Sequence, residues 1–156
     1  MNGVPVTVRG VAGAPLEQAF DVIAPIDLAS IFTGYGPLPG VRGVRDQSGD
    51  WDHVGAQRVV ELTDGNEARE RITHFEPPGY FAYEVGPFSG PLNRLVERAD
   101  GEWWFARATG GTEITWTYTF IPRSRMGFVV RWVVAPMWKA YARRVLSQAL
   151  RVVEQT

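Results

Sequence analysis

The sequence has 156 residues, of which 45% are hydrophobic and 21% charged, so it fits a single globular domain over residues 1–156 and not a disordered segment. It contains no cysteine, which excludes disulfides, thiolate metal sites and cysteine nucleophiles. The formal net charge of −1 argues against a protein dedicated to nucleic acid, because such proteins carry a strongly basic surface.

The first part of the chain predicts a strand followed by two short helices. Residues 4–11 alternate between apolar and polar side chains, as a half-buried strand does. Pro15 is suited to the first position of a helix, and apolar residues then recur at helical spacing as far as Pro25. Asp27 is placed to cap a second short helix, which leads to Phe32.

The middle of the chain predicts a long loop and several strands. Residues 34–55 are rich in glycine and proline, which is typical of loops, and Asp64-Gly65-Asn66 has the composition of a hairpin turn. Pro77-Pro78-Gly79 indicates a further break between strands. The strands expected here are residues 41–45, 57–62, 68–75 and 80–86.

The residues around Gly110-Gly111 favour a hairpin between strands 103–109 and 112–121. Pairing Thr109 with Thr112 places bulky side chains on one face and mostly small or hydroxylated side chains on the other. We expect the bulky face to point into the protein. It carries Trp103, Phe105, Trp116, Tyr118 and Phe120, together with Arg107 opposite Ile114.

After Pro122 the apolar residues take a helical period, with a stripe that runs from Trp138 to Val152. Pro136 is expected to kink this helix, or to divide it into a short leading segment and a main helix of roughly twenty residues. Residues 122–156 carry seven basic side chains against Glu154 alone, so the first 121 residues are correspondingly acidic. This asymmetry fits a weak contact with an anionic lipid surface, but a basic helix face is more often simply solvated.

Neither a targeting signal nor a membrane span is predicted. The first residues lack a basic region followed by an apolar run. The longest apolar stretch, residues 128–138, is interrupted by Arg131 and is far shorter than the ~20 residues that a spanning helix needs. We therefore expect a cytoplasmic protein.

Three short segments, taken in their order and spacing, are similar to those of a known superfamily. They are Ala14–Phe20 (APLEQAF), Val54–Arg58 (VGAQR) and Glu70–Pro78 (ERITHFEPP), the last followed by Tyr80. Over essentially the whole chain the sequence resembles the START-like (SRPBCC) helix-grip superfamily, and within it the polyketide cyclase/dehydrase and lipid transport family. The resemblance implies an α+β fold: a strongly curved antiparallel sheet of about seven strands wrapped around a long C-terminal helix, with two short helices after the first strand.

A strongly bent sheet cannot fill its concave side with its own side chains, so a helix laid across it leaves an apolar cavity. The leading hypothesis is therefore that the protein binds a small hydrophobic molecule, lipid-like, polyketide-like or aromatic, without a cofactor. Each aromatic candidate also fits a packed core, and Arg107 fits either a polar group of the ligand or an internal carboxylate. The ligand-binding candidates are Phe32, Phe105, Arg107, Trp116, Tyr118, Phe120, Trp132 and Trp138.

Two alternatives belong to other functional classes. One is a cyclase, aromatase or dehydratase, in which His74, Tyr83 or Glu84 moves a proton; a buried Glu70 would also suit this chemistry. The other is a membrane-surface or partner-docking module that uses the basic C-terminal helix. A metal site is not expected, because His53 and His74 are the only histidines and their spacing matches no ligand motif.

Overall fold

The fold is a single antiparallel sheet with helices on one side of it. A computed structural model describes residues 3–156. The strands are β1 (Val4–Ala12), β2 (Val41–Arg45), β3 (Gln57–Leu62), β4 (Glu67–Glu76), β5 (Tyr80–Phe88), β6 (Val96–Ala108) and β7 (Gly111–Pro122). The helices are α1 (Leu16–Ile23), α2 (Leu28–Ile31), a 3-10 turn (Pro91–Arg94), α3 (Gly127–Val129), a π-helical turn (Val130–Val134) and α4 (Ala135–Glu154).

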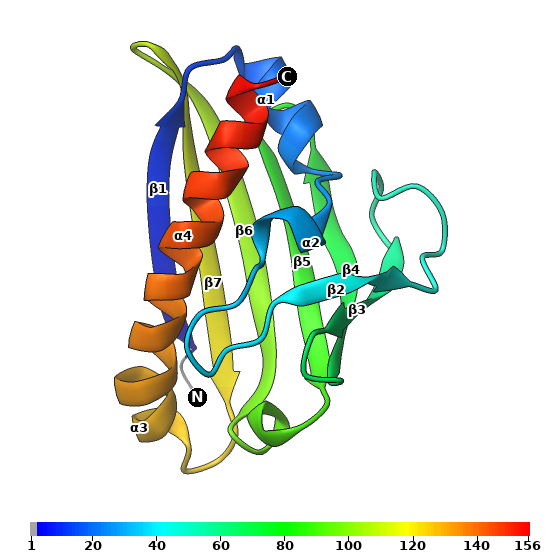
Figure 1. Cartoon of the computed structure of the whole chain (residues 1–156), viewed down its shortest axis with the longest axis vertical. Helices are drawn as coiled ribbons and strands as arrows, with labels where there is room; N and C mark the ends of the chain where they lie inside the picture. Colours follow the sequence, from blue (N-terminus) through cyan, green and yellow to red (C-terminus); the bar gives the residue numbers. More distant parts are fainter. Residues whose placement is uncertain (1–2) are drawn as a thin grey trace.

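The seven strands follow the order β1-β7-β6-β5-β4-β3-β2, and every neighbouring pair is antiparallel. Figure 1 shows α4 lying along β1 and β7, with α1 and α2 on the same side of the sheet. Register shifts in the pairs β2–β3, β4–β5 and β6–β7 increase the bend of the sheet. The predicted helix-grip architecture is confirmed, including the two short helices after the first strand.

The β6–β7 hairpin differs from the sequence expectation in its register. Ala108 pairs with Gly111, so all pairings are offset by two residues from the Thr109–Thr112 register. An offset of two leaves every side chain on its predicted face, because strand side chains alternate with a period of two. Trp103 therefore still points inward, but it pairs with Trp116 instead of Tyr118.

A close approach between two chain segments explains this register. Gly111 lies so near β1 that a Cβ atom at this position would be 1.9 Å from the carbonyl oxygen of Ala12. The second glycine of the pair is thus required for packing against β1, and the turn itself falls on Thr109 and Gly110.

The C-terminal helix divides where the sequence predicted, with α4 covering 20 residues from Ala135. Ahead of it, the N–H of Ala135 donates to the carbonyl of Val130, which is the hydrogen bond of a π turn. Pro136 has no N–H to offer to the preceding turn, so that turn widens and α4 begins anew. Within residues 3–156 no helix combines the length and the apolar composition needed to cross a membrane.

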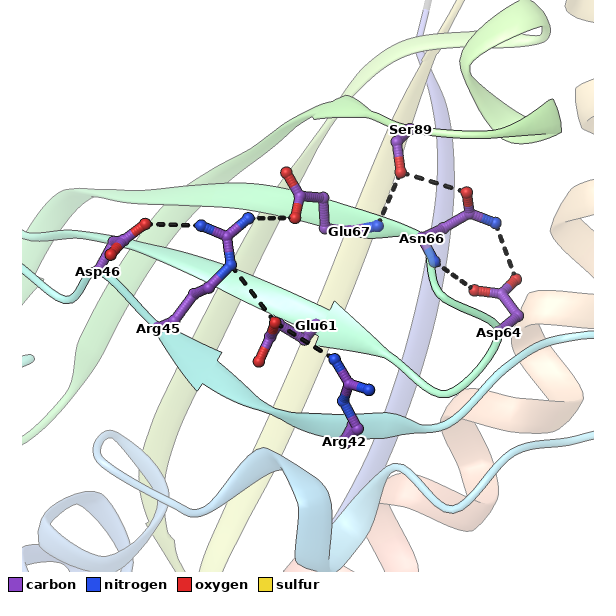
Figure 2. A network of polar contacts seen from close by, with 8 residues as sticks. All are labelled: Arg42, Arg45, Asp46, Glu61, Asp64, Asn66, Glu67 and Ser89. Atoms are coloured by element: carbon purple, nitrogen blue, oxygen red, sulfur yellow. Dashed lines mark hydrogen bonds and ion pairs between the residues drawn. The ribbon is translucent and has the colours of Figure 1, made fainter.

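At the β2 edge of the sheet, polar side chains form the network shown in Figure 2. Arg45 bonds Asp46, Glu61 and Glu67, and Arg42 adds a second bond to Glu61 at 3.3 Å. These groups are at least partly exposed, so water screens each pair and the pairs contribute little to stability. Charges along an edge strand also disfavour pairing with another molecule.

The two hairpin glycines give a matched test of this packing. Gly111→Ala should lower the free energy of unfolding by at least about 3 kcal/mol, because the new Cβ collides with the backbone of β1. Gly110→Ala meets no atom within 4 Å and has only a positive φ of 86° to accommodate, so about 1 kcal/mol is expected. Urea denaturation measures both changes, and equal losses would contradict the proposed contact.

Candidate functional site

A cavity of about 160 Å³ lies between the concave face of the sheet, α2 and the first turns of α4. Its wall is predominantly apolar and aromatic. A cavity of similar size, about 150 Å³, is large enough to hold benzene inside a protein. The space therefore accommodates a small ring system or a short aliphatic chain.

Five of the predicted ligand-binding residues lie in this wall. Phe32 comes from the end of α2, Trp138 from α4, and the other three, Trp116, Tyr118 and Phe120, from β7. Alternation along β7 explains why the last three face the same side. Their placement agrees with the sequence analysis, and their role in binding stays a prediction.

The prediction that three further residues line the cavity is wrong: these are Phe105, Arg107 and Trp132. Phe105 packs edge to face on Phe20 of α1, with ring centroids 5.2 Å apart, so it belongs to the packed core. Arg107 lies at the exposed end of β6, where its Nη2 bonds Glu17 at 2.9 Å. Trp132 is 64% exposed, because the π turn directs it away from the sheet.

Two of the three catalytic candidates also point away from the cavity. A register shift between Ile72 and His74 reverses the side-chain alternation of β4, so Ile72 is buried while His74 is exposed. Glu84 lies on the outer face, where it bonds Arg71 at 2.7 Å. Tyr83 alone of the three lies in the cavity wall.

A buried ion pair between Arg58 and Glu70 forms the polar part of the wall. These residues face each other across β3 and β4, and their side chains are only 8% and 11% exposed. The Nε and Nη2 atoms of Arg58 both lie 2.9 Å from Oε1 of Glu70. Because both contacts end on Oε1, the lone pairs of Oε2 stay available to another donor.

The Arg58 guanidinium is also held from its other side. The loop between β2 and β3 places the ring of Trp51 against it, with Cζ 3.9 Å from the ring centroid. Trp51 is itself buried and packs on Ile72 and Ala56. This cation–π contact and the Glu70 carboxylate together fix the charge at the cavity wall.

Tyr83 brings a hydroxyl group to the same region. It is a diagonal neighbour of Glu70 across β4 and β5, and the indole Nε1 of Trp103 donates to its hydroxyl at 3.4 Å. Its ring lies over β6 at Gly101, where a Cβ atom would be 2.3 Å from Cζ. Burial, and then the nearby Glu70 carboxylate, raise the pKa of Tyr83, so the phenol stays protonated and can donate.

Two further donors in the wall have no protein acceptor. The indole nitrogens of Trp116 and Trp138 are buried and are the only such side-chain atoms without a hydrogen-bond partner in the described part of the chain. Buried donors are nearly always satisfied, so such an exception needs a reason. An oxygen atom of a bound molecule would be a suitable acceptor.

The roof of the cavity is tied to α4 by one side chain. The hydroxyl of Tyr141 accepts a bond from the N–H of Gly34 at 3.0 Å and donates to the carbonyl of Pro39 at 2.9 Å. Burial raises the pKa of Tyr141 above its usual value, so the donor is retained at neutral pH. This arrangement holds the glycine- and proline-rich loop after α2 over the cavity.

The sequence contains a signal for the ion pair. The turn at Asp64-Gly65-Asn66 sets a register in which Arg58 opposes Glu70, and both residues alternate in phase with apolar neighbours. Arg58 lies in the VGAQR segment and is not among the binding residues that the sequence predicts. No group of three or more histidine, aspartate and glutamate side chains suited to a metal is present among residues 3–156.

Removing one partner of the ion pair should be costly. Arg58→Met leaves the Glu70 carboxylate buried without a counter-charge, so we expect a loss of about 3–5 kcal/mol in unfolding free energy. The double variant Arg58→Met/Glu70→Leu removes both charges and should recover most of that loss. As a control, Arg71→Met breaks an exposed pair and should cost less than about 1 kcal/mol. Chemical denaturation distinguishes these outcomes, and equal losses for Arg58→Met and Arg71→Met would contradict the burial.

A change at Gly101 tests the position of Tyr83. Gly101→Ala places a methyl group in the space of the Tyr83 ring and should destabilise the protein by about 1–3 kcal/mol. Gly43→Ala is the matched control, because a Cβ at that strand position meets no atom within 4 Å. If thermal unfolding shows the same small effect for both variants, Tyr83 does not lie over β6 as described.

Comparison with known proteins gives one family. The family model described as polyketide cyclase / dehydrase and lipid transport matches residues 4–156. A search of curated proteins found no match.

Similar solved structures share the fold at low sequence identity. Ginseng major latex-like protein 151 from Panax ginseng has a TM-score of 0.72 and 11% identity, with 97% of each chain covered. Protein MLL2253 from Mesorhizobium loti has a TM-score of 0.71 and 12% identity, with 97% of this chain and 98% of that chain covered. Ara h 8.0201 has a TM-score of 0.68 and 14% identity, with 99% of each covered.

Proposed function

Because this chain belongs to the polyketide cyclase/dehydrase and lipid transport family, we propose that it binds a small, mainly apolar molecule in the cavity under α4. We further infer that this molecule carries one uncharged polar group, which lies against Arg58, Glu70 and Tyr83. The observation that carries the proposal is a largely apolar cavity whose one ion pair is already complete.

The completed ion pair decides which polar groups are compatible with the cavity. A carboxylate ligand would bring a second anion next to one cation, and an ammonium ligand would add a second cation. Either charge would lose its hydration without a full partner, which costs several kcal/mol. A hydroxyl or phenol group carries no such cost.

A neutral hydroxyl group also matches the donors and acceptors of the wall. Its proton can bond Oε2 of Glu70, while its oxygen accepts from the Tyr83 hydroxyl or from the indole N–H of Trp116. The remainder of the ligand contacts aromatic rings, whose burial of apolar surface contributes about 25 cal/mol per Å². The polar contacts thus orient the ligand, and the apolar contacts supply most of the affinity.

The geometry favours binding over catalysis. His74 and Glu84 point away from the cavity, Glu70 is engaged by Arg58, and the raised pKa of Tyr83 makes its phenol a poor base. The wall thus offers groups that orient a ligand and lacks a free base.

Three probes of one shape test the proposal: naphthalene, 2-naphthol and 2-naphthoate. We expect 2-naphthol to bind at least about tenfold more tightly than 2-naphthoate at neutral pH, because only the naphthoate carries a charge into the cavity. Isothermal titration calorimetry with the protein in the syringe avoids the low solubility of the probes. Tighter binding of 2-naphthoate would contradict the neutral-ligand proposal.

Two variants make the test specific to the cavity. Tyr83→Phe should weaken 2-naphthol about two- to tenfold and leave naphthalene unchanged, because it removes one hydrogen bond and keeps the ring. Ala68→Phe fills space on the inner face of β4 and should abolish binding of all three probes. Absence of probe binding to the folded wild type, together with no small molecule co-purifying in native mass spectrometry, would overturn the proposed function.

A further inference from the structure

The segment that joins β7 to α4 carries an exposed apolar surface. Phe128, Trp132 and Val133 are 75%, 64% and 55% exposed, and the rings of Phe128 and Trp132 lie 6.5 Å apart. We call these three residues the apolar patch. Figure 1 places the segment at the α3 end of the molecule, far from α1.

Local helix geometry produces the patch. Val130 and Val134 of the π turn are buried in the core, so the residues between them must point outward. The other large hydrophobic side chains that are exposed lie singly on separate segments, as is common at protein surfaces. A cluster that includes two adjacent aromatic rings needs a partner surface.

The charges along the segment that carries the patch are of one sign. Residues 122–153 contain basic side chains and no aspartate or glutamate. Arg125 precedes the patch, Arg131 lies within it, and both are exposed. Neither forms an ion pair with another residue of the described chain. The surface therefore combines aromatic rings with uncompensated positive charge.

We propose that the apolar patch docks on an anionic membrane surface. The rings of Phe128 and Trp132 enter the boundary between headgroups and acyl chains, and Arg125 and Arg131 contact lipid phosphates. Aromatic residues with flanking arginines suit this interface, because their apolar parts insert while their polar parts stay hydrated. Each basic residue near an anionic leaflet adds about 1 kcal/mol of attraction.

A second copy of the chain fits this surface less well. In a symmetric dimer the same patch meets itself, so Arg125 and Arg131 of both copies would approach one another without an intervening acid. A bilayer with anionic headgroups supplies both the apolar depth and the opposite charge. The complementarity thus favours lipid as the occupant.

The patch also lies close to the cavity wall. Val134 and Trp138, which follow the patch in the same helical stretch, line the cavity from the inside. Docking would bring this wall to the membrane, the place where an apolar ligand is concentrated. The docking proposal does not depend on ligand binding, because the patch and its charges are present whether or not the cavity is filled.

Vesicle co-sedimentation of the full chain at low salt tests the proposal. We expect binding to vesicles of phosphatidylcholine with phosphatidylglycerol and much weaker binding to phosphatidylcholine alone, with affinity falling as salt is added. The double variant Phe128→Ser/Trp132→Ser should weaken binding at least about tenfold, because it removes the inserted rings. Arg125→Glu/Arg131→Glu should do the same by reversing the charge.

A matched control separates docking through the patch from non-specific adsorption of exposed aromatic residues to vesicles. Trp104→Ser replaces an exposed tryptophan on the outer face of β6 and should leave vesicle binding unchanged. The patch variants should keep the unfolding midpoint of the wild type, because they alter exposed side chains, and all variants should keep its 2-naphthol affinity, because they lie away from the cavity. Failure of the wild type to bind anionic vesicles overturns the proposal. So does a wild-type dimer that the serine variants dissociate while vesicles have no effect, since the patch would then bind a second copy.

Discussion

The stacked rings of Trp103 and Trp116 set how the helix and the sheet meet. Their centroids are 4.7 Å apart on the concave face, and the ring of Trp138 from α4 packs edge to face on Trp116 at 5.9 Å. α4 follows β1 and β7 and does not cover the β3–β5 part of the sheet (Figure 1). There the loop after α2 forms the roof, held by Tyr141. The cavity is the space enclosed by this loop, α4 and the concave face of the sheet.

The buried ion pair between Arg58 and Glu70 is the basis of the neutral-ligand proposal. An apolar pair of similar volume is often about as stable as a buried ion pair, so stability alone does not explain the presence of Arg58 and Glu70. Together they offer a carboxylate oxygen and a fixed positive charge, while the net charge of the pair is zero. With the protonated phenol of Tyr83 beside them, they match the neutral ligand proposed above, which both donates and accepts a hydrogen bond.

The helical stretch at the start of α4 connects the inside of the protein with its surface. Its inward residues line the cavity, and its outward residues form the apolar patch. Both faces are present within the π turn before Pro136, where Val130 and Val134 point inward and Trp132 and Val133 point outward. A single proline thus bears on the ligand-binding proposal and on the docking proposal.

The sequence by itself determined the order of the elements, the division of the last helix at Pro136, and the inward face of the β6–β7 hairpin, because these follow from periodicity along one segment. Only the tertiary structure decided which inward residues line a cavity. A register shift between two strands turned His74 outward, and Arg107 lies at the exposed end of β6, where it pairs with Glu17. The pairing of Arg58 with Glu70 required two strands to meet in a given register. Such features depend on how separate strands and helices meet, which the pattern along a single element does not encode.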